Sequence, residues 1–172
     1  MPFEVNRRDL IRIGASAALA APAAFAVTNA PKFFTPGEFA MLNELTELII
    51  PSDDHSPGAR AAQVAAYIDA RVAEAFETKD RDDWRSGLRL VDDLSRKMHS
   101  HAFMEASPGE RVAVLTRMAK NEMKPGTPEE VFFRELKHAT AHAYYTSKIG
   151  IHQEMGYKGN VMLEEFVGYE VK

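Results

Sequence analysis

The 172-residue sequence contains no cysteine. A chain without cysteine has no disulfide framework, no thiolate nucleophile and no cysteine ligand for zinc, an iron–sulfur cluster or an attached haem. A basic run is also missing, and the formal net charge is −4. Because binding to a nucleic-acid duplex requires a basic face, nucleic acid is not expected as a partner. The nucleotide-binding loops G-x-G-x-x-G and G-x-x-x-x-G-K-[ST] are absent as well.

The first 30 residues have the pattern of a removable export signal. A basic start precedes a run of small apolar residues from 13 to 27. This run is too short for a membrane-spanning helix, which needs about 20 residues. It contains Ala24 and Ala26 in an A-x-A cleavage pattern. We therefore predict a signal peptide over residues 1–26, a single domain over residues 27–172, and no membrane span once the signal is removed.

The signal resembles the twin-arginine type, because Arg7 and Arg8 are followed by a polar residue and two large apolar ones in NRRDLIR. This resemblance implies a bacterial pathway that exports folded proteins to the periplasm, which is most useful for proteins that bind a cofactor before export. The remaining chain has no visible cofactor motif. Two interpretations stay open: the signal serves a cofactor-loaded partner, or this chain folds quickly and uses the pathway alone.

Three tetrapeptides predict the start of a helix, since each has a hydroxyl at the N-cap, proline at the first helical position and glutamate two residues later. They are Thr35-Pro-Gly-Glu38, Ser107-Pro-Gly-Glu110 and Thr127-Pro-Glu-Glu130. Apolar residues at helical spacing support these helices and predict two more. No segment alternates as a strand does. The sequence predicts an all-α, irregular bundle of about five helices, including one over residues 59–76, followed by a glycine-rich, extended C-terminal tail.

Few residues combine in a catalytic or metal-binding pattern. His138 and His142 are one helical turn apart and could begin a metal site, but HATAH lacks the glutamate of H-E-x-x-H and no third ligand follows by spacing. His99 and His101 would point in different directions on a continuous helix. The group Asp53-Asp54-His55 suits acid–base chemistry or cation binding, but equally a turn. We assign no catalytic, cofactor-binding or metal-binding residue to this chain.

The segment YYTSKIGIHQEMGYKGN, residues 144–160, combines tyrosines with glycines. Tyrosine offers a large, partly apolar contact area, and glycine allows close backbone approach. A protein interface, the chain's own core and a stacked ligand are all compatible with this composition. We predict a partner interface, formed by Tyr144, Tyr145, Gly150, Gly156, Tyr157, Gly159 and Asn160.

Together with the leader, three segments resemble the gluconate 2-dehydrogenase subunit 3 family: LTELIIPSDDHSPGARAAQVAAYID (45–69), FFRELKHATAHAYYTSKIG (132–150) and MGYKGN (155–160). The resemblance implies a non-catalytic small (gamma) subunit of a periplasmic sugar, glucoside or sugar-acid dehydrogenase. It further implies a large partner subunit of the glucose–methanol–choline oxidoreductase type, which binds FAD, and a cytochrome c subunit that passes electrons onward. The small subunit supports folding, stability and export of the large one.

Two alternatives follow from the residues themselves. One is a self-sufficient periplasmic enzyme, or a sugar- or metal-binding protein, that uses the Asp53/His55 loop or the His138/His142 face. The other is a homodimeric helical bundle. Turnover or metal retention by the purified chain would favour the first, and light scattering would reveal the second.

Overall fold

The computed structural model describes residues 30–159, of which 31–159 belong to one compact unit. The described residues form helices and turns without any strand, so the all-α prediction is confirmed. The elements, in chain order, are α2 (Pro36–Ile49), α3 (Gly58–Ala61), α4 (Val64–Ala73), α5 (Thr78–His99), the 3-10 turn η1 (Phe103–Glu105), α6 (Pro108–Ala119), α7 (Pro128–Tyr145) and the π-helical turn η2 (Gly150–Glu154). The C-terminal tail from residue 160 onward lies outside the described residues.

The three predicted helix starts are confirmed. The Thr35, Ser107 and Thr127 hydroxyls each accept a hydrogen bond from the backbone N–H of the glutamate three residues later. In the first two, the glutamate also accepts a bond from the cap residue's N–H, which completes a capping box. The third glutamate, Glu130, is instead buried and accepts bonds from the Gly126 N–H and from the Asn121 side chain. This arrangement joins α7 to the turn before it.

The predicted helix over residues 59–76 is wrong in its continuity and its end. Gln63 has a left-handed backbone with φ of 55°, which separates α3 from α4. The apolar residues Val64, Ile68 and Val72 still face the core. Phe76, assigned to the same stripe, lies beyond the end of α4 and is 95% exposed. The spacing of four therefore identified the buried face correctly, but it wrongly added Phe76, which lies three residues beyond the last residue of α4, Ala73.

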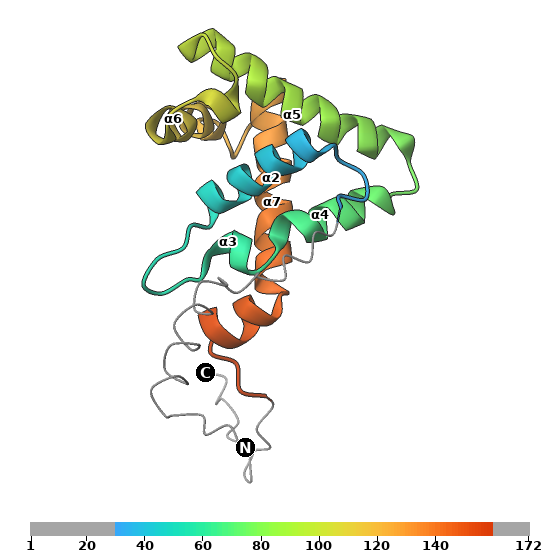
Figure 1. The fold of residues 1–172 in the computed structure, drawn as a ribbon, viewed down its shortest axis with the longest axis vertical. Helices are drawn as coiled ribbons and strands as arrows, with labels where there is room; N and C mark the ends of the chain where they lie inside the picture. The colour runs from blue at the N-terminus through green and yellow to red at the C-terminus, as the bar shows by residue number, and fades with distance from the viewer. Residues whose placement is uncertain (1–29, 160–172) are drawn as a thin grey trace, which may run out of the picture. The chain divides into compact units, whose positions relative to one another are not determined.

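Helix α7 occupies the centre of the bundle (Figure 1), where it contacts α2, α4, α5 and α6. Its buried residues Phe132, Phe133 and Leu136 belong to one core that also contains residues of the other four helices. Trp84 of α5 packs edge-on against Phe132, with 5.7 Å between ring centroids. Burying each large apolar side chain of this kind stabilises the fold by about 1.5–3 kcal/mol.

Helices α5 and α7 pack tightly at Gly87. A Cβ atom placed there would lie 2.0 Å from Phe132 Cδ2, far inside van der Waals contact. We expect Gly87→Ala to lower the free energy of unfolding by roughly 1–3 kcal/mol, because an overpacked core must shift. Urea denaturation of the purified chain measures this change. Gly109→Ala is the control, since an added Cβ has no neighbour within 4 Å; equal losses in both variants would contradict the steric explanation.

Candidate partner interface

Tyr144, predicted to contact a partner, lies in the core of its own chain, so this part of the interface prediction is wrong. Its side chain is 0% exposed. The Tyr144 and Ser56 hydroxyl oxygens are 2.8 Å apart, and Tyr144 Oη donates to Glu154 Oε2 at 3.3 Å. Burial raises the pKa of the Tyr144 hydroxyl. The residue therefore links the loop before α3 to η2 rather than offering a surface.

Gly150, another predicted interface residue, is also buried within the chain. A Cβ there would lie 2.1 Å from the backbone oxygen of Tyr144. The Gly150 N–H donates to Ser147 Oγ at 3.0 Å, and the Ser147 hydroxyl in turn donates to the Tyr144 carbonyl at 2.6 Å. Glycine is required here because the chain folds back onto the end of α7. The close backbone approach at Gly150 is therefore to the chain itself and not, as predicted, to a partner.

The exposed part of the segment is formed by Tyr145, Met155 and Tyr157, whose exposed fractions are 45%, 54% and 45%. Gly156 and Gly159 have φ of 61° and 105°, where other residues are strained, and neither is crowded by neighbouring atoms. These two glycines therefore shape the turn that presents Tyr157. We call Tyr145, Met155 and Tyr157 the C-terminal surface; its contact with a partner stays a prediction.

The remaining predicted residues of the leader and the interface lie outside the described residues: Arg7, Arg8, Ala24, Ala26 and Asn160.

The loop with Asp53, Asp54 and His55 is exposed but well ordered by its own hydrogen bonds. Asp53 Oδ1 accepts the His55 and Ser56 N–H groups at 2.8 and 2.7 Å. These two backbone hydrogen bonds, in that order, lower the pKa of Asp53. Asp53 thus acts as a turn former, which is the structural alternative given for this group. Asp53 accepts the N–H of Ser56, and the hydroxyl of Ser56 connects the loop to Tyr144.

The histidine pairs differ in their surroundings. His138 and His142 lie on α7, and the His142 ring is 6.1 Å from that of Tyr67. Within residues 30–159, no three His, Cys, Asp or Glu side chains are grouped closely enough to bind a metal ion.

None of the helices in the same range is both long and apolar enough to cross a membrane.

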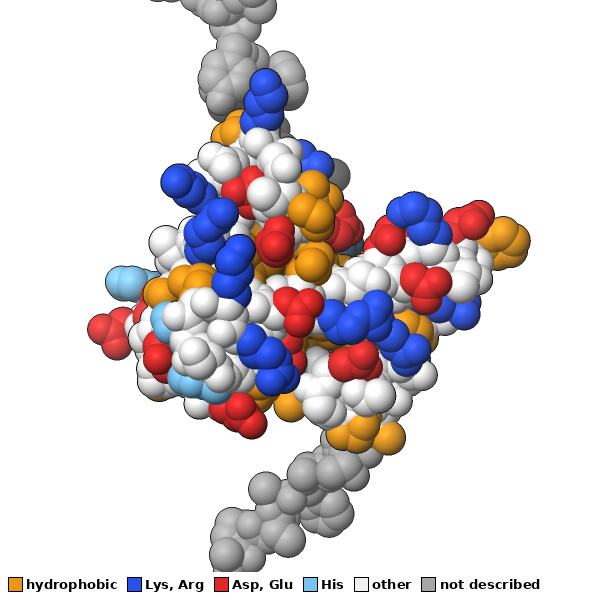
Figure 2. All heavy atoms as spheres, turned by 90° about the horizontal axis from the view of Figure 1, so that it is seen from above, with side chains coloured by type: hydrophobic (Ala, Val, Ile, Leu, Met, Phe, Trp, Pro, Cys, Tyr) orange, Lys and Arg blue, Asp and Glu red, His pale blue; other side chains and the backbone are white. Residues whose placement is uncertain are grey.

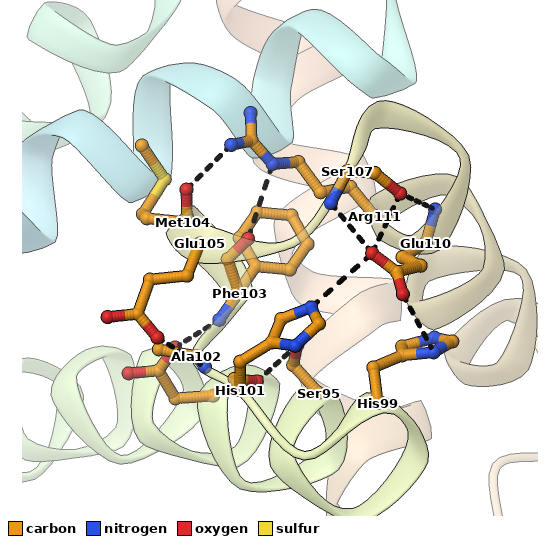
Figure 3. A network of polar contacts seen from close by, with 11 residues as sticks. Ser95, His99, His101, Ala102, Phe103, Met104, Glu105, Ser107, Glu110 and Arg111 are labelled. Carbon is orange, nitrogen blue, oxygen red and sulfur yellow. Dashed lines mark hydrogen bonds and ion pairs between the residues drawn. The ribbon is translucent and has the colours of Figure 1, made fainter.

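His99 and His101 face the same carboxylate, contrary to the expectation that their rings diverge. Figure 3 shows both rings turned toward Glu110, with His101 Nε2 at 3.3 Å from Oε2 and His99 Nδ1 at 3.6 Å from Oε1. The rings come together because α5 ends at His99 and Ser100 has φ of 69°. The Ser107 hydroxyl and N–H, followed by His101, hold the pKa of Glu110 at about 2.

A second exposed apolar region, which the sequence did not predict, is a groove between α4, α5 and α7. Its volume is about 1170 Å³. Trp84 and Phe132 lie in it, and exposed apolar side chains of Tyr67, Phe76 and Val131 line it. On the face seen in Figure 2, acidic and basic side chains are interspersed, with apolar side chains between them. The sequence feature that points to this groove is Phe76, a large apolar residue that is exposed because it lies beyond the end of α4.

The comparison with protein families gives one match. The sequence model described as gluconate 2-dehydrogenase subunit 3 matches residues 36–161. The chain belongs to the gluconate 2-dehydrogenase subunit 3 family.

Membership of the subunit 3 family makes the chain a subunit of a dehydrogenase complex, which implies a catalytic partner. The matched residues include α2 to α7, η2, the groove and the C-terminal surface. No curated protein and no solved structure gives a significant match to the chain.

The low pKa of Glu110 predicts a pH dependence of stability. A carboxylate whose pKa is lower in the folded state than in the unfolded state stabilises the fold above its unfolded pKa, and this contribution is lost as the pH falls. For Glu110 the loss should occur between pH 4.5 and about 2. We expect Glu110→Gln to reduce the pH dependence of unfolding in that window. Urea titrations at several pH values test this, with Glu129→Gln as control; identical profiles for wild type and Glu110→Gln would contradict it.

The buried hydroxyl of Tyr144 predicts a loss of stability in Tyr144→Phe. Phenylalanine keeps the ring but leaves Ser56 and Glu154 without this partner. A net hydrogen bond contributes about 0.5–1.5 kcal/mol, so we expect a loss of that size in the free energy of unfolding. Tyr145→Phe is the matched control, because the side chain of Tyr145, the next residue, is 45% exposed. Calorimetry measures both, and a larger effect of Tyr145→Phe would oppose this assignment.

Proposed function

We propose that this subunit 3 chain is the non-catalytic small (gamma) subunit of a periplasmic, FAD-dependent dehydrogenase for sugars, glucosides or sugar acids. Its partner is a large catalytic subunit of the glucose–methanol–choline type, and a cytochrome c is the further partner that accepts electrons. The small subunit supports folding, stability and twin-arginine export of the large one. The observation that carries this proposal is the family match over residues 36–161.

The proposal places FAD in the partner. A dinucleotide cofactor is held in open α/β folds by a glycine-rich turn between a strand and a helix. Residues 30–159 form helices and turns without a strand, so they do not supply that arrangement. The described histidines and carboxylates that contact each other, such as His101 and Glu110, serve helix ends. In this proposal the chain binds and stabilises its partner.

Two exposed apolar regions support partner binding: the C-terminal surface and the groove lined by Phe76 and Val131. Protein interfaces are enriched in aromatic side chains, which both regions offer, and in methionine, which the C-terminal surface adds as Met155. Exposed apolar groups are costly in a free subunit but stabilise a complex when a partner covers them. Periplasmic location follows in this proposal from the leader, which precedes the folded body in the sequence.

Export of the partner by this leader is directly testable. The chain and its catalytic partner are expressed together in a bacterium that has the twin-arginine pathway. We expect Arg7→Lys combined with Arg8→Lys to leave both proteins in the cytoplasm, because the paired arginines are the feature that the pathway requires. Cell fractionation, with dehydrogenase activity measured in each fraction, shows where the complex is.

The matched control is Arg12→Lys, which also exchanges a leader arginine but keeps the pair intact. Export should be normal in this variant. A catalytic subunit that reaches the periplasm with the double variant would argue against carriage by this leader. A catalytic subunit that folds, is exported and oxidises its substrate without this chain at all would overturn the proposed function.

A further inference from the structure

The segment between the leader and α2 is fixed to the body by a buried carboxylate. Asp69, on α4, is 3% exposed. Its Oδ2 accepts the Lys32 N–H at 2.5 Å, and its Oδ1 accepts the Phe33 and Phe34 N–H groups at 3.0 and 2.9 Å. In Figure 1 the blue segment that precedes α2 bends toward α4. Three consecutive backbone donors therefore converge on one side chain that is distant in sequence.

A second residue, Arg85 on α5, holds the same segment from the other side. Its Nη2 donates to the Phe33 carbonyl at 3.0 Å, and its guanidinium carbon lies 4.3 Å from the centre of the Phe33 ring. Phe34 is buried and packs edge-on against Trp84, with 6.4 Å between ring centroids. We call the contacts of Lys32, Phe33 and Phe34 with Asp69 and Arg85 the Asp69 clamp.

The partners in the clamp come from α4 and α5, so it forms only after these helices have packed. A buried carboxylate is costly unless it is hydrogen-bonded. The three N–H groups of residues 32–34 donate to Asp69. The body and the segment thus need each other: without the segment the carboxylate loses its donors, and without α4 the N–H groups lose their acceptor.

The clamp begins close to the leader. Only residues 27–31 lie between the predicted cleavage site after Ala26 and Lys32. Fully extended, these residues span roughly 17 Å. An open clamp would place Phe33 and Phe34, together with three unpaired N–H groups, as an unfolded apolar stretch directly after the signal.

We propose that the Asp69 clamp couples export to folding: residues 32–34, which follow the predicted leader, are ordered only in a chain in which α4 and α5 have packed, and a chain with an open clamp is exported less. This inference rests on the proposed export function and adds a device that couples it to the folded state. Asp69 and Arg85 are positioning residues in this scheme, since they act through the backbone of residues 32–34.

The test uses the full chain with its own leader, expressed together with the catalytic partner. In Asp69→Ala we expect amide hydrogen exchange at Lys32, Phe33 and Phe34 to accelerate at least tenfold, while far-ultraviolet circular dichroism still reports the helical body. The periplasmic fraction should fall several-fold. Arg85→Gln, at a partly exposed side chain, should shift both readouts in the same direction and carries the test if Asp69→Ala does not fold.

Asp92→Asn is the matched control. Asp92 Oδ1 accepts a backbone bond from the Phe103 N–H at 2.9 Å, so this variant weakens a contact between a carboxylate and the backbone outside the clamp. It should leave residues 32–34 protected and export unchanged. Reduced export in Asp92→Asn equal to that in Asp69→Ala would assign the effect to general destabilisation and overturn the proposal.

Two further outcomes separate the clamp from the export function. Unchanged exchange at residues 32–34 in Asp69→Ala, or faster exchange with normal export, would refute the role of the clamp while the paired-arginine variant still fails to export. Normal export of the paired-arginine variant would refute the proposed twin-arginine function, and with it the coupling of this clamp to export.

Discussion

The packing of α7 against four other helices is the interaction on which the rest of the described structure depends. Its middle contributes Phe132, Phe133 and Leu136 to the core, and Gly87 allows α5 to pack tightly against Phe132. Both ends of α7 are then used differently. At the start, buried Glu130 collects hydrogen bonds from the preceding turn. At the other end, Tyr144 orders the segments that form the C-terminal surface.

Tyr144 explains how segments distant in sequence form one region. Through Ser56 it contacts the loop of residues 51–57, and through Glu154 it contacts η2. Both segments lie within the family match over residues 36–161, and the structure shows that they meet. The two neighbouring tyrosines thus differ: Tyr144 is buried and forms hydrogen bonds inside the chain, whereas Tyr145 is partly exposed to solvent. A binding surface is effective only when a rigid interior holds it in place.

The N-terminal junction follows the same physical rule. Asp69 would be an unfavourable buried charge without the N–H groups of residues 32–34, and those groups need a buried acceptor. Residues 32–34, which follow the predicted leader in the sequence, are thus part of the tertiary structure. The family match makes the chain a subunit of a dehydrogenase complex, and its exposed apolar regions suit contact with a partner.

The sequence by itself determined the helical class, the three capped helix starts and the buried faces, because caps and apolar periodicity act over only a few residues. Only the tertiary structure decided the break at Gln63, the convergence of His99 and His101, and the burial of Tyr144. Each depends on a backbone reversal or on a partner far along the chain, such as Ser56 for Tyr144. The composition of residues 144–160 indicated that their tyrosines contact apolar surface. Only the packing determined that the chain itself buries Tyr144 and leaves Tyr145 and Tyr157 exposed.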